Sequence, residues 1–302
     1  MGVHISGRTR LAGIIGMPVE HSASPAMHNA AYEALGLEWA YVPLPVAEEA
    51  HLARVVSAIR VLPFVGFNVT MPYKDAMLEL CDEVALTARL AGAVNAVHCA
   101  DGRLVGYNTD GRGLIDSLAE DLGFDPAGKR VVVLGAGGAA GAAVVSLVLA
   151  KAGQITVVNR TYANAEDLVE RITPHARDTR IDAAELGETG EESVSAADLI
   201  VNATPIGMEP GDPAPVPAKW LRANHVVADM IYAAADTPLV AAARASGAHA
   251  VDGLGMLVCQ GATAIEIWSE GAQLVAPRDI MRAAAQRELR LRAERGGGAV
   301  AG

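Results

Sequence analysis

The sequence predicts an α/β protein of two domains, one of them built on a doubly wound parallel sheet. Short runs rich in Val, Ile and Ala alternate along the chain with stretches whose apolar residues recur at helical spacing. The 302 residues exceed the roughly 100–200 residues of one typical domain. Hydrophobic residues make up 51% of the chain and aromatic residues only 4%, so small aliphatic side chains must form the core. Such cores suit buried parallel strands and closely packed helices.

The first part of the chain predicts alternating strands and helices followed by a hairpin. We expect strands at 10–16, 39–46 and 65–70, helices at 24–37, 47–62 and 74–92, and a hairpin over 93–110. In the first helix, Ser24 is the expected N-cap, Pro25 suits the first position and Gly36 lies near the end. The dipeptide Asp101-Gly102 is a typical hairpin turn.

The pattern changes after residue 110, where a helix that could bridge two domains leads into a second α/β region. We expect a helix at 111–123, a strand–loop–helix–strand unit at 129–161, strands within 196–207, 225–232 and 249–256, and helices at 257–271 and 279–295. The change of pattern, rather than of composition, places the domain break here. The arginine-rich end of the last helix is most simply a solvated face.

The segment VVVLGAGGAAG carries a glycine fingerprint in the context that dinucleotide binding requires. Gly135, Gly137 and Ala140 occupy the G-x-G-x-x-G/A positions, after a strand and at the start of a helix. Gly135 permits the tight turn, Gly137 lets a pyrophosphate approach the backbone, and Ala140 allows close packing of helix on strand. The helix N-terminus offers free N–H groups to phosphate. We therefore expect a Rossmann-type domain here, against the alternative of a purely structural turn.

The end of the next strand indicates which dinucleotide binds. A carboxylate at this position would bind the ribose 2′-hydroxyl of NAD, and an arginine can hold the 2′-phosphate of NADP. The sequence has Asn159, Arg160 and Thr161 there, without a carboxylate. The planar donors of Arg160 suit phosphate, which favours NADP; the alternative is an ordinary surface arginine.

Bulk properties exclude several other classes of protein. The net charge of −11 leaves no broad basic face, so we expect no nucleic-acid partner. Cys81, Cys99 and Cys259 form no CxxC pair and the histidines lack ligand spacing, so we expect neither a disulfide framework nor a metal site. These cysteines fit a reducing, cytoplasmic setting. The first residues lack the apolar region of a secretory signal, and the apolar segment 139–153 is too short to span a membrane, so we expect no membrane association.

Polar side chains gather where strands of the first part begin or end. They are Ser22, Ser24, Thr70, Lys74, Asn95 and Asp110. Thr70 and Lys74 follow a strand that the proline of NVTMPYK would end, because proline has no N–H for a ladder. Each residue also has a structural explanation taken singly, such as helix capping for Ser24 or turn formation for Asn95 and Asp110. Together, beside a dinucleotide fold, they predict a site for a small polyhydroxylated anion.

The order and spacing of these motifs identify a resemblance that covers nearly the whole chain. The motifs are HSASPAMHNAA, GFNVTMPYK, GAVNAV, GYNTDGRG, LGAGGAA, VVNRT, NATPIGM, ADMIY and DGLGMLVCQGA. In this order they resemble shikimate dehydrogenase. The resemblance implies a discontinuous substrate-binding α/β domain, residues 1–112 completed by 255–302, and a Rossmann NADP-binding domain, residues 113–254, with a cleft between them. It also implies reversible NADP-linked reduction of 3-dehydroshikimate to shikimate in aromatic amino acid biosynthesis.

The resemblance further implies a role for each matching residue. Lys74 would be the acid/base residue with Asp110 beside it, Ser22 and Ser24 would bind the substrate carboxylate, and Thr70, Asn95, Asp110, Tyr232 and Gln260 would complete the substrate pocket. Gly135, Ala136, Gly137, Gly138 and Ala139 would cradle the pyrophosphate, Asn159, Arg160 and Thr161 would hold the adenosine phosphate, and Thr204, Met230 and Gly253 would line the nicotinamide side. Hydride delivery leaves negative charge on the carbonyl oxygen, and a lysine ammonium can stabilise that charge and donate its proton.

Two departures from the family pattern leave alternatives open. Many relatives have an arginine where this chain has Gly141, and a second basic residue where it has Asn164. Phosphate binding would then depend largely on Arg160, so NAD use is an alternative, as is a quinate/shikimate dehydrogenase. A dinucleotide-sensing protein without catalysis is a third, although the presence of both Lys74 and Asp110 argues against it. The expected assembly is a monomer or a homodimer.

Overall fold

The computed structural model describes residues 5–269 and 274–295, which divide into two compact α/β units. The first unit runs to Thr109 and includes Val258–Arg295, and the second is Asp110–Leu257. The predicted end of a helix at 270–271 and the predicted domain ends at 1–4 and 296–302 lie outside the described residues. Within the described ranges, we find no helix with the length and hydropathy to cross a membrane.

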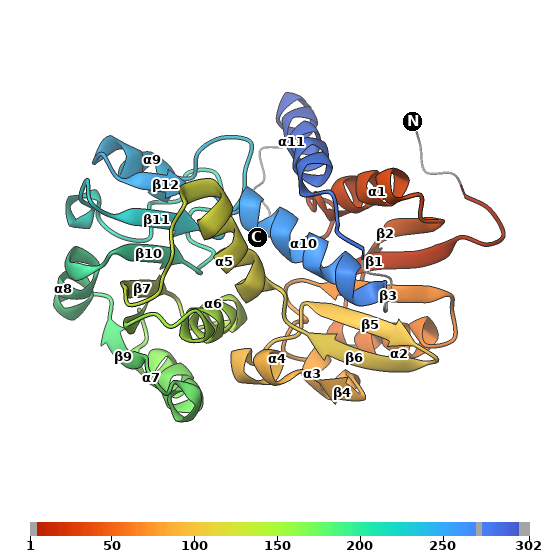
Figure 1. Cartoon of the computed structure of the whole chain (residues 1–302), viewed down its shortest axis with the longest axis horizontal. Coiled ribbons are helices and arrows are strands. Elements are labelled where there is room, and N and C mark those ends of the chain that lie inside the picture. The colour runs from red at the N-terminus through yellow and green to blue at the C-terminus, as the bar shows by residue number, and fades with distance from the viewer. Residues whose placement is uncertain (1–4, 270–273, 296–302) are drawn as a thin grey trace. The chain divides into compact units, whose positions relative to one another are not determined.

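The first unit contains a mixed six-stranded sheet in the order β2-β1-β3-β5-β6-β4 (Figure 1). Its strands are β1 (Arg10–Gly16), β2 (Trp39–Pro45), β3 (Phe64–Val69), β4 (Glu83–Val84), β5 (Ala96–Ala100) and β6 (Arg103–Tyr107). Strand β1 runs parallel to β2 and β3, whereas β5 is antiparallel to both β3 and β6. The carboxyl ends of β1, β3 and β6 and the start of β5 therefore lie at one edge of the sheet.

Helices cover this sheet and bury its apolar side chains. They are α1 (Ser24–Leu35), α2 (Leu52–Ile59) with the preceding 3₁₀ turn η1 (Glu49–His51), α3 (Met77–Leu80), α4 (Leu86–Ala91), α10 (Leu254–Trp268) and α11 (Arg278–Glu294). Helix α1 packs against β1, β2 and α11, and α3 and α4 pack against β6. Phe67, Met77 and Leu104 are fully buried members of the resulting core.

The second unit contains a wholly parallel sheet in the order β12-β11-β10-β7-β8-β9. Its strands are β7 (Arg130–Leu134), β8 (Gln154–Asn159), β9 (Arg180–Glu185), β10 (Leu199–Asn202), β11 (Val226–Asp229) and β12 (His249–Val251). Chain order reverses between β7 and β10, which are neighbours in the sheet. Ligands of doubly wound sheets bind outside the carboxyl ends of the strands at such a switch point.

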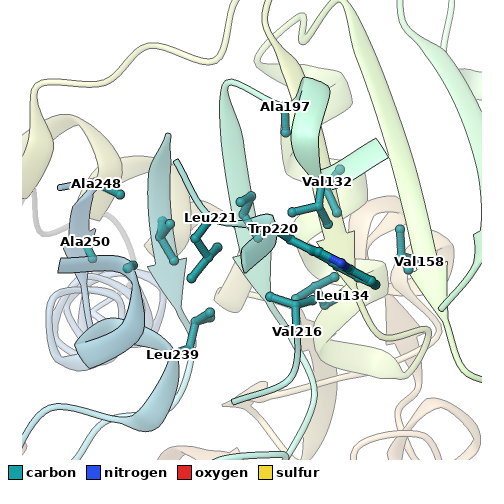
Figure 2. Packing of buried hydrophobic residues seen from close by; sticks show 14 of the residues in the cluster. Val132, Leu134, Val158, Ala197, Val216, Trp220, Leu221, Leu239, Ala248 and Ala250 are labelled. Atoms are coloured by element: carbon teal, nitrogen blue, oxygen red, sulfur yellow. The ribbon is translucent and has the colours of Figure 1, made fainter. Parts of the chain in front are cut away.

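Helices and 3₁₀ turns complete the second unit. They are α5 (Asp110–Leu122), α6 (Gly138–Leu149), α7 (Tyr162–Ile172), η2 (Thr173–His175), α8 (Glu188–Ala196), η3 (Ala218–Trp220) and α9 (Pro238–Ala245). Helix α5 packs against α6. Helices α7 and α8 both pack against β9, and α9 packs against β11 and β12. Figure 2 shows the core around Trp220, which lies among Val132, Leu134 and Val216. Small aliphatic side chains fill most of this core, as the composition predicts.

The predicted α/β class with a doubly wound domain is confirmed, but the single helix predicted over 74–92 is wrong. Two short helices, α3 and α4, flank the strand β4 there. Glu83 pairs with Val105 of β6, and the Asp82 carboxylate accepts a hydrogen bond from the N–H of Leu104 at 2.7 Å. Pairing with a distant strand thus overrides the local helical pattern.

The predicted N-cap of α1 is also wrong. Ala23 occupies the cap and Ser24 is the first helical residue. The Ser22 hydroxyl accepts a hydrogen bond from the N–H of Ser24 at 3.2 Å, so Ser22 satisfies one of the free donors at the start of the helix. Gly36, with φ of 66°, ends the helix as expected.

Candidate active site

Ser22 lies in the turn between β1 and α1 and Ser24 is the first residue of α1, at the sheet edge of the first unit where β1 and β3 end. The N–H of Ser22 donates to the Val19 carbonyl at 3.0 Å. Ser24 is buried, and Ser22 is half-buried. Arg292 of α11 donates from Nη2 to the Ser22 carbonyl at 2.7 Å. The two predicted carboxylate ligands therefore lie two residues apart, in a segment that Arg292 ties to α11.

Thr70 and Lys74 follow β3 in a backbone turn, as the sequence predicts. The N–H of Thr70 donates to the Ile15 carbonyl at 2.8 Å, which ties this turn to the neighbouring strand β1. The N–H of Tyr73 donates to the Thr70 carbonyl at 3.1 Å, and the N–H of Val94 donates to the Lys74 carbonyl at 2.8 Å. Lys74 is half-buried and lies in the turn that precedes α3.

A buried hydrogen-bond cluster joins Asn95, Thr109 and Gln260 at the same edge. Asn95 Oδ1 accepts from the N–H of Thr109 at 2.7 Å, and Asn95 Nδ2 donates to Thr109 Oγ1 at 3.0 Å and to Gln260 Oε1 at 3.4 Å. The structure thus brings together Asn95 at the start of β5 and Gln260 on α10, as predicted. Sequence analysis missed Thr109, which is 2% exposed. Thr109 lies inside the motif GYNTDGRG, and this position could have identified it as a member of the site.

Asp110 and Tyr232 belong to the second unit. Asp110 is the first residue of α5 and follows Thr109 directly in the chain, and it is buried. Tyr232 is also buried, three residues after the end of β11. Their predicted roles beside Lys74 stay predictions.

The glycine turn after β7 has the geometry that a phosphate-binding loop needs. Gly135 adopts φ of 106°, and a Cβ there would lie 3.0 Å from the Ala203 carbonyl oxygen and from Thr204 Cγ2. Glycine is therefore required by the backbone and by the close approach of the loop after β10. Gly137 is the N-cap of α6, and a Cβ there would meet no described atom within 4 Å. Protein packing leaves this position open, which fits the predicted approach of a pyrophosphate.

The remaining residues of this turn also lie where the fingerprint predicts. Ala140 is fully buried beneath the first turn of α6, whereas Ala136, Gly138 and Ala139 are half-buried. The N-terminus of α6 follows β7, the strand next to the switch point. This arrangement presents free N–H groups and the positive end of a helix dipole to an anion.

The residues after β8 present an exposed cation. Asn159 ends β8, and its Nδ2 donates to the Thr161 carbonyl at 2.9 Å, which closes a tight turn around Arg160. Arg160 and Thr161 are exposed, as is Asn164 in the first turn of α7. Within the described chain, no hydrogen bond or ion pair engages the Arg160 guanidinium. Its donor fork is thus accessible to a ligand, and the predicted contact with phosphate stays a prediction.

A buried network behind the switch point connects the residues predicted to line the nicotinamide side. Asn202 Oδ1 accepts from Thr204 Oγ1 at 2.7 Å and from the N–H of Thr204 at 3.1 Å. The Asn202 carbonyl accepts from the N–H of Met230 at 3.0 Å. A Cβ at Gly253 would lie 2.3 Å from the Met230 carbonyl oxygen. Thr204, Met230 and Gly253 are therefore brought together as expected, and Asn202 is the residue that connects the first two.

Asp229 lies at the centre of this network. Its carboxylate accepts hydrogen bonds from Asn202 Nδ2 at 2.9 Å, from the N–H of Ile231 at 3.1 Å and from Thr237 Oγ1 at 2.6 Å. Burial raises the pKa of Asp229 to about 6, although these three hydrogen bonds act in the opposite direction. Sequence analysis did not identify Asn202, Asp229 or Thr237 as members of the site. Their contacts join residues 8 to 27 positions apart, which no local motif reveals.

The two units offer polar and cationic groups for organic ligands. Among residues 5–269 and 274–295, we find no cluster of three or more His, Cys, Asp or Glu side chains that could hold a metal ion. Cys81, Cys99 and Cys259 are free thiols, and burial raises the pKa of Cys81 and of Cys99 to about 12. High pKa values keep both thiols protonated and unreactive as nucleophiles.

A parallel sheet with a glycine turn and a helix N-terminus at its switch point defines a dinucleotide-binding protein. Comparison with known proteins extends this class to a family. Residues 14–97 match the model of the shikimate dehydrogenase substrate-binding domain, and residues 117–206 match that of shikimate/quinate 5-dehydrogenase. The chain belongs to the shikimate dehydrogenase family.

Individual relatives are similar over most of their length. The chain is 47% identical over 266 residues to an NADP(+) shikimate dehydrogenase of Geobacter sp. strain M21, which covers 88% of this chain and 91% of the relative. The structure of shikimate 5-dehydrogenase from Thermus thermophilus, in complex with NADP(H) and shikimate, matches with a TM-score of 0.83 at 34% identity, over 93% and 100% of the two chains. That of shikimate 5-dehydrogenase from Listeria monocytogenes, in complex with shikimate and NAD, matches with a TM-score of 0.85 at 35% identity, over 94% and 98%.

Proposed function

We propose that this chain is an NADP-dependent shikimate dehydrogenase, an oxidoreductase that reversibly reduces 3-dehydroshikimate to shikimate in aromatic amino acid biosynthesis. The observation that carries this proposal is that the chain belongs to the shikimate dehydrogenase family. The nine sequence motifs quoted above support it. The substrate is a small molecule, and the chain acts as a monomer or a homodimer. A cytoplasmic setting is supported by Cys81, Cys99 and Cys259, none of which forms a disulfide bond among the described residues.

The substrate site of the proposal is the sheet edge of the first unit. Ser22 and Ser24 bind the carboxylate, and Thr70 and Asn95 bind hydroxyl groups, with Gln260 held beside Asn95. The proposal also assigns Asp110 and Tyr232, which belong to the second unit, to substrate binding. Hydroxyl and amide groups suit this substrate because they donate to a carboxylate and exchange hydrogen bonds with its hydroxyl groups.

Lys74 is the acid/base residue of the proposed reaction. When a hydride reaches the substrate carbonyl carbon, the oxygen gains negative charge, and the Lys74 ammonium stabilises it and donates a proton. In the reverse direction Lys74 accepts the alcohol proton as the hydride leaves. Asp110 orients the lysine and accepts a hydrogen bond from a substrate hydroxyl group.

The cofactor site of the proposal is the glycine turn and the end of β8. The turn from Gly135 to Ala139 cradles the pyrophosphate at the N-terminus of α6. Arg160 holds the 2′-phosphate of NADP with Asn159 and Thr161, and the dinucleotide, when bound, supplies or accepts the hydride. Thr204, Met230 and Gly253 form the nicotinamide side.

Initial rates of shikimate oxidation test the reaction and the choice of cofactor. NADP and NAD are compared in parallel, with quinate as second substrate. We expect shikimate with NADP to give the highest kcat/KM. Higher kcat/KM with NAD or quinate would favour the alternative of a quinate/shikimate dehydrogenase, consistent with Gly141 and Asn164 at the two departing positions. Cofactor binding without turnover would favour a dinucleotide-sensing protein.

A lysine variant tests the acid/base role. We expect Lys74→Ala to lower kcat by about 10²- to 10⁴-fold, the contribution typical of a general acid or base. Lys129→Ala is the matched control, because Lys129 is exposed at the start of β7 in the second unit. A kcat near the wild-type value in a folded Lys74→Ala variant would refute the role.

An arginine variant tests the phosphate role. Removing the guanidinium in Arg160→Leu takes away charged hydrogen bonds worth about 1.5–3 kcal/mol, so KM for NADP rises about 10- to 100-fold. KM for NAD, which lacks the 2′-phosphate, stays within about twofold. Arg171→Leu, on the next helix, is the control. An equal rise in KM for both cofactors would refute the assignment.

A further inference from the structure

The last helix reaches the turn that carries the proposed carboxylate ligands. Arg292, near the end of α11, donates from Nη2 to the Ser22 carbonyl at 2.7 Å across 270 residues of sequence. Its Nε donates to Glu288 Oε1 at 2.8 Å one helical turn earlier. The Arg292 side chain is 17% exposed, so the expectation of a uniformly solvated arginine face is wrong at this position.

The hydrogen bond from Arg292 holds Ser22, whose N–H, hydroxyl and carbonyl groups all form hydrogen bonds. The N–H of Ser22 donates to Val19, its hydroxyl accepts from the N–H of Ser24, and its carbonyl accepts from Arg292. Because the first two bonds are formed within the turn itself, the bond from Arg292 is the one of the three that ties Ser22 to another element. The direction of the Ser22 and Ser24 hydroxyl groups depends on this backbone.

The chemistry of the contact requires an arginine. Two nitrogens of one planar fork reach Glu288 and the Ser22 carbonyl at once, which the single ammonium of lysine cannot reproduce. The third nitrogen, Nη1, is buried and has no hydrogen-bond partner among the described residues. A buried donor without a partner costs about 1–3 kcal/mol, so packing stability alone does not account for an arginine here.

We propose that Arg292 is a positioning residue for recognition of the substrate carboxylate, acting through Ser22. This role rests on the proposed function, in which Ser22 and Ser24 bind that carboxylate. The guanidinium holds the turn in the geometry that lets both hydroxyl groups donate to one anion. The C-terminal helix of the first unit therefore contributes to substrate affinity.

Three variants on α11 test the role. Arg292→Met keeps most of the apolar stem and removes the guanidinium, Arg292→Lys restores charge without the fork, and Arg290→Met alters an exposed arginine of the same helix. We measure kcat, KM for shikimate, KM for NADP and the melting temperature of each. For Arg292→Met we expect KM for shikimate to rise about tenfold, with KM for NADP and kcat within about twofold. Arg292→Lys should recover part of the loss, and Arg290→Met should match the wild type.

A double-mutant cycle with Ser22→Ala tests whether Arg292 acts through Ser22. Once the Ser22 hydroxyl is absent, Arg292→Met should raise KM for shikimate by less than about twofold, because the two changes affect one interaction. Fully additive effects, or an equal rise in KM for both substrates, would overturn the role. If Arg292→Met does not fold, Arg292→Lys in the same cycle gives the answer. A wild-type chain that does not oxidise shikimate would instead refute the proposed function itself.

Discussion

The buried carboxylate of Asp229 gives the second unit a pH dependence that can be calculated and measured. Asp229 is 2% exposed, and burial raises its pKa from the ordinary 3.8 to about 6. The folded protein therefore binds this proton more tightly than the unfolded chain does. Protonated Asp229 therefore makes its full contribution to the free energy of unfolding below pH 4. This contribution is lost as the pH rises through 6.

The size of this effect follows from the shift. About two pKa units at 1.36 kcal/mol each correspond to about 3 kcal/mol in the free energy of unfolding between pH 4 and pH 7. Asp229→Asn removes the titration and keeps the size of the side chain. Its amide oxygen can still accept from Asn202 and from the N–H of Ile231, and the Thr237 hydroxyl can turn to accept from the new amide. The stability of the variant relative to wild type should therefore rise by about 3 kcal/mol from pH 4 to pH 7.

Urea unfolding of both proteins over this pH range provides the measurement. Unfolding is followed by circular dichroism, and the difference between the two proteins cancels the other titrating groups, which they share. Thr189→Val, at an exposed hydroxyl on α8, is the control and should give a constant difference. A constant difference for Asp229→Asn as well would refute the raised pKa and the argument from burial.

Three further predictions, made with five variants, test other parts of the two units. Gly137→Ala should leave the melting temperature unchanged but raise KM for NADP, whereas Gly135→Ala should destabilise the fold by about 1–3 kcal/mol, because its φ is 106°. Thr237→Val should lower stability by about 1–2 kcal/mol in urea unfolding, because it removes the N-cap bond to Val240 at 3.3 Å, and Thr237→Ser should not. The stability of His28→Phe relative to wild type should rise by about 3 kcal/mol as the pH falls from 6.5 to 4, since burial lowers the pKa of His28 to about 4 and the variant lacks this titration. Equal behaviour of the paired variants, or an unchanged acid profile, would contradict these expectations.

Local patterns predicted the parts of the site that lie within one turn of the chain. The glycine fingerprint placed Gly135 and Gly137 correctly, because strand, turn and helix follow one another directly. The turn carrying Lys74 was predicted for the same reason, since Pro72 cannot continue a strand. Such features depend on the conformational limits of a few consecutive residues.

Features that depend on distant partners were not predicted. The helix expected over 74–92 is interrupted because Glu83 pairs with β6, and the helical pattern does not contain that partner. Arg292 has the sequence of a solvated helix face, yet its partner lies 270 residues away. Strand β9 and helices α7, α8 and α9 were not assigned from the sequence either. Long-range contacts of this kind are fixed by the packed fold.

His28 and Asp229, one buried ionisable group in each unit, respond to acid in opposite directions. His28 lies in the first unit, stacked on Tyr41 with ring centroids 4.1 Å apart, and its Nδ1–H donates to the Ser24 carbonyl at 2.9 Å. Acidification from pH 6.5 to 4 withdraws the stability that neutral His28 provides, while over the same range protonation of Asp229 stabilises the second unit. Because each effect is about 3 kcal/mol, they nearly cancel in the stability of the whole chain. Through these two groups, acid therefore acts against the unit that carries Ser24 and Lys74 and in favour of the unit that carries the glycine turn. His225, whose pKa burial also lowers, acts against the second unit as the pH falls.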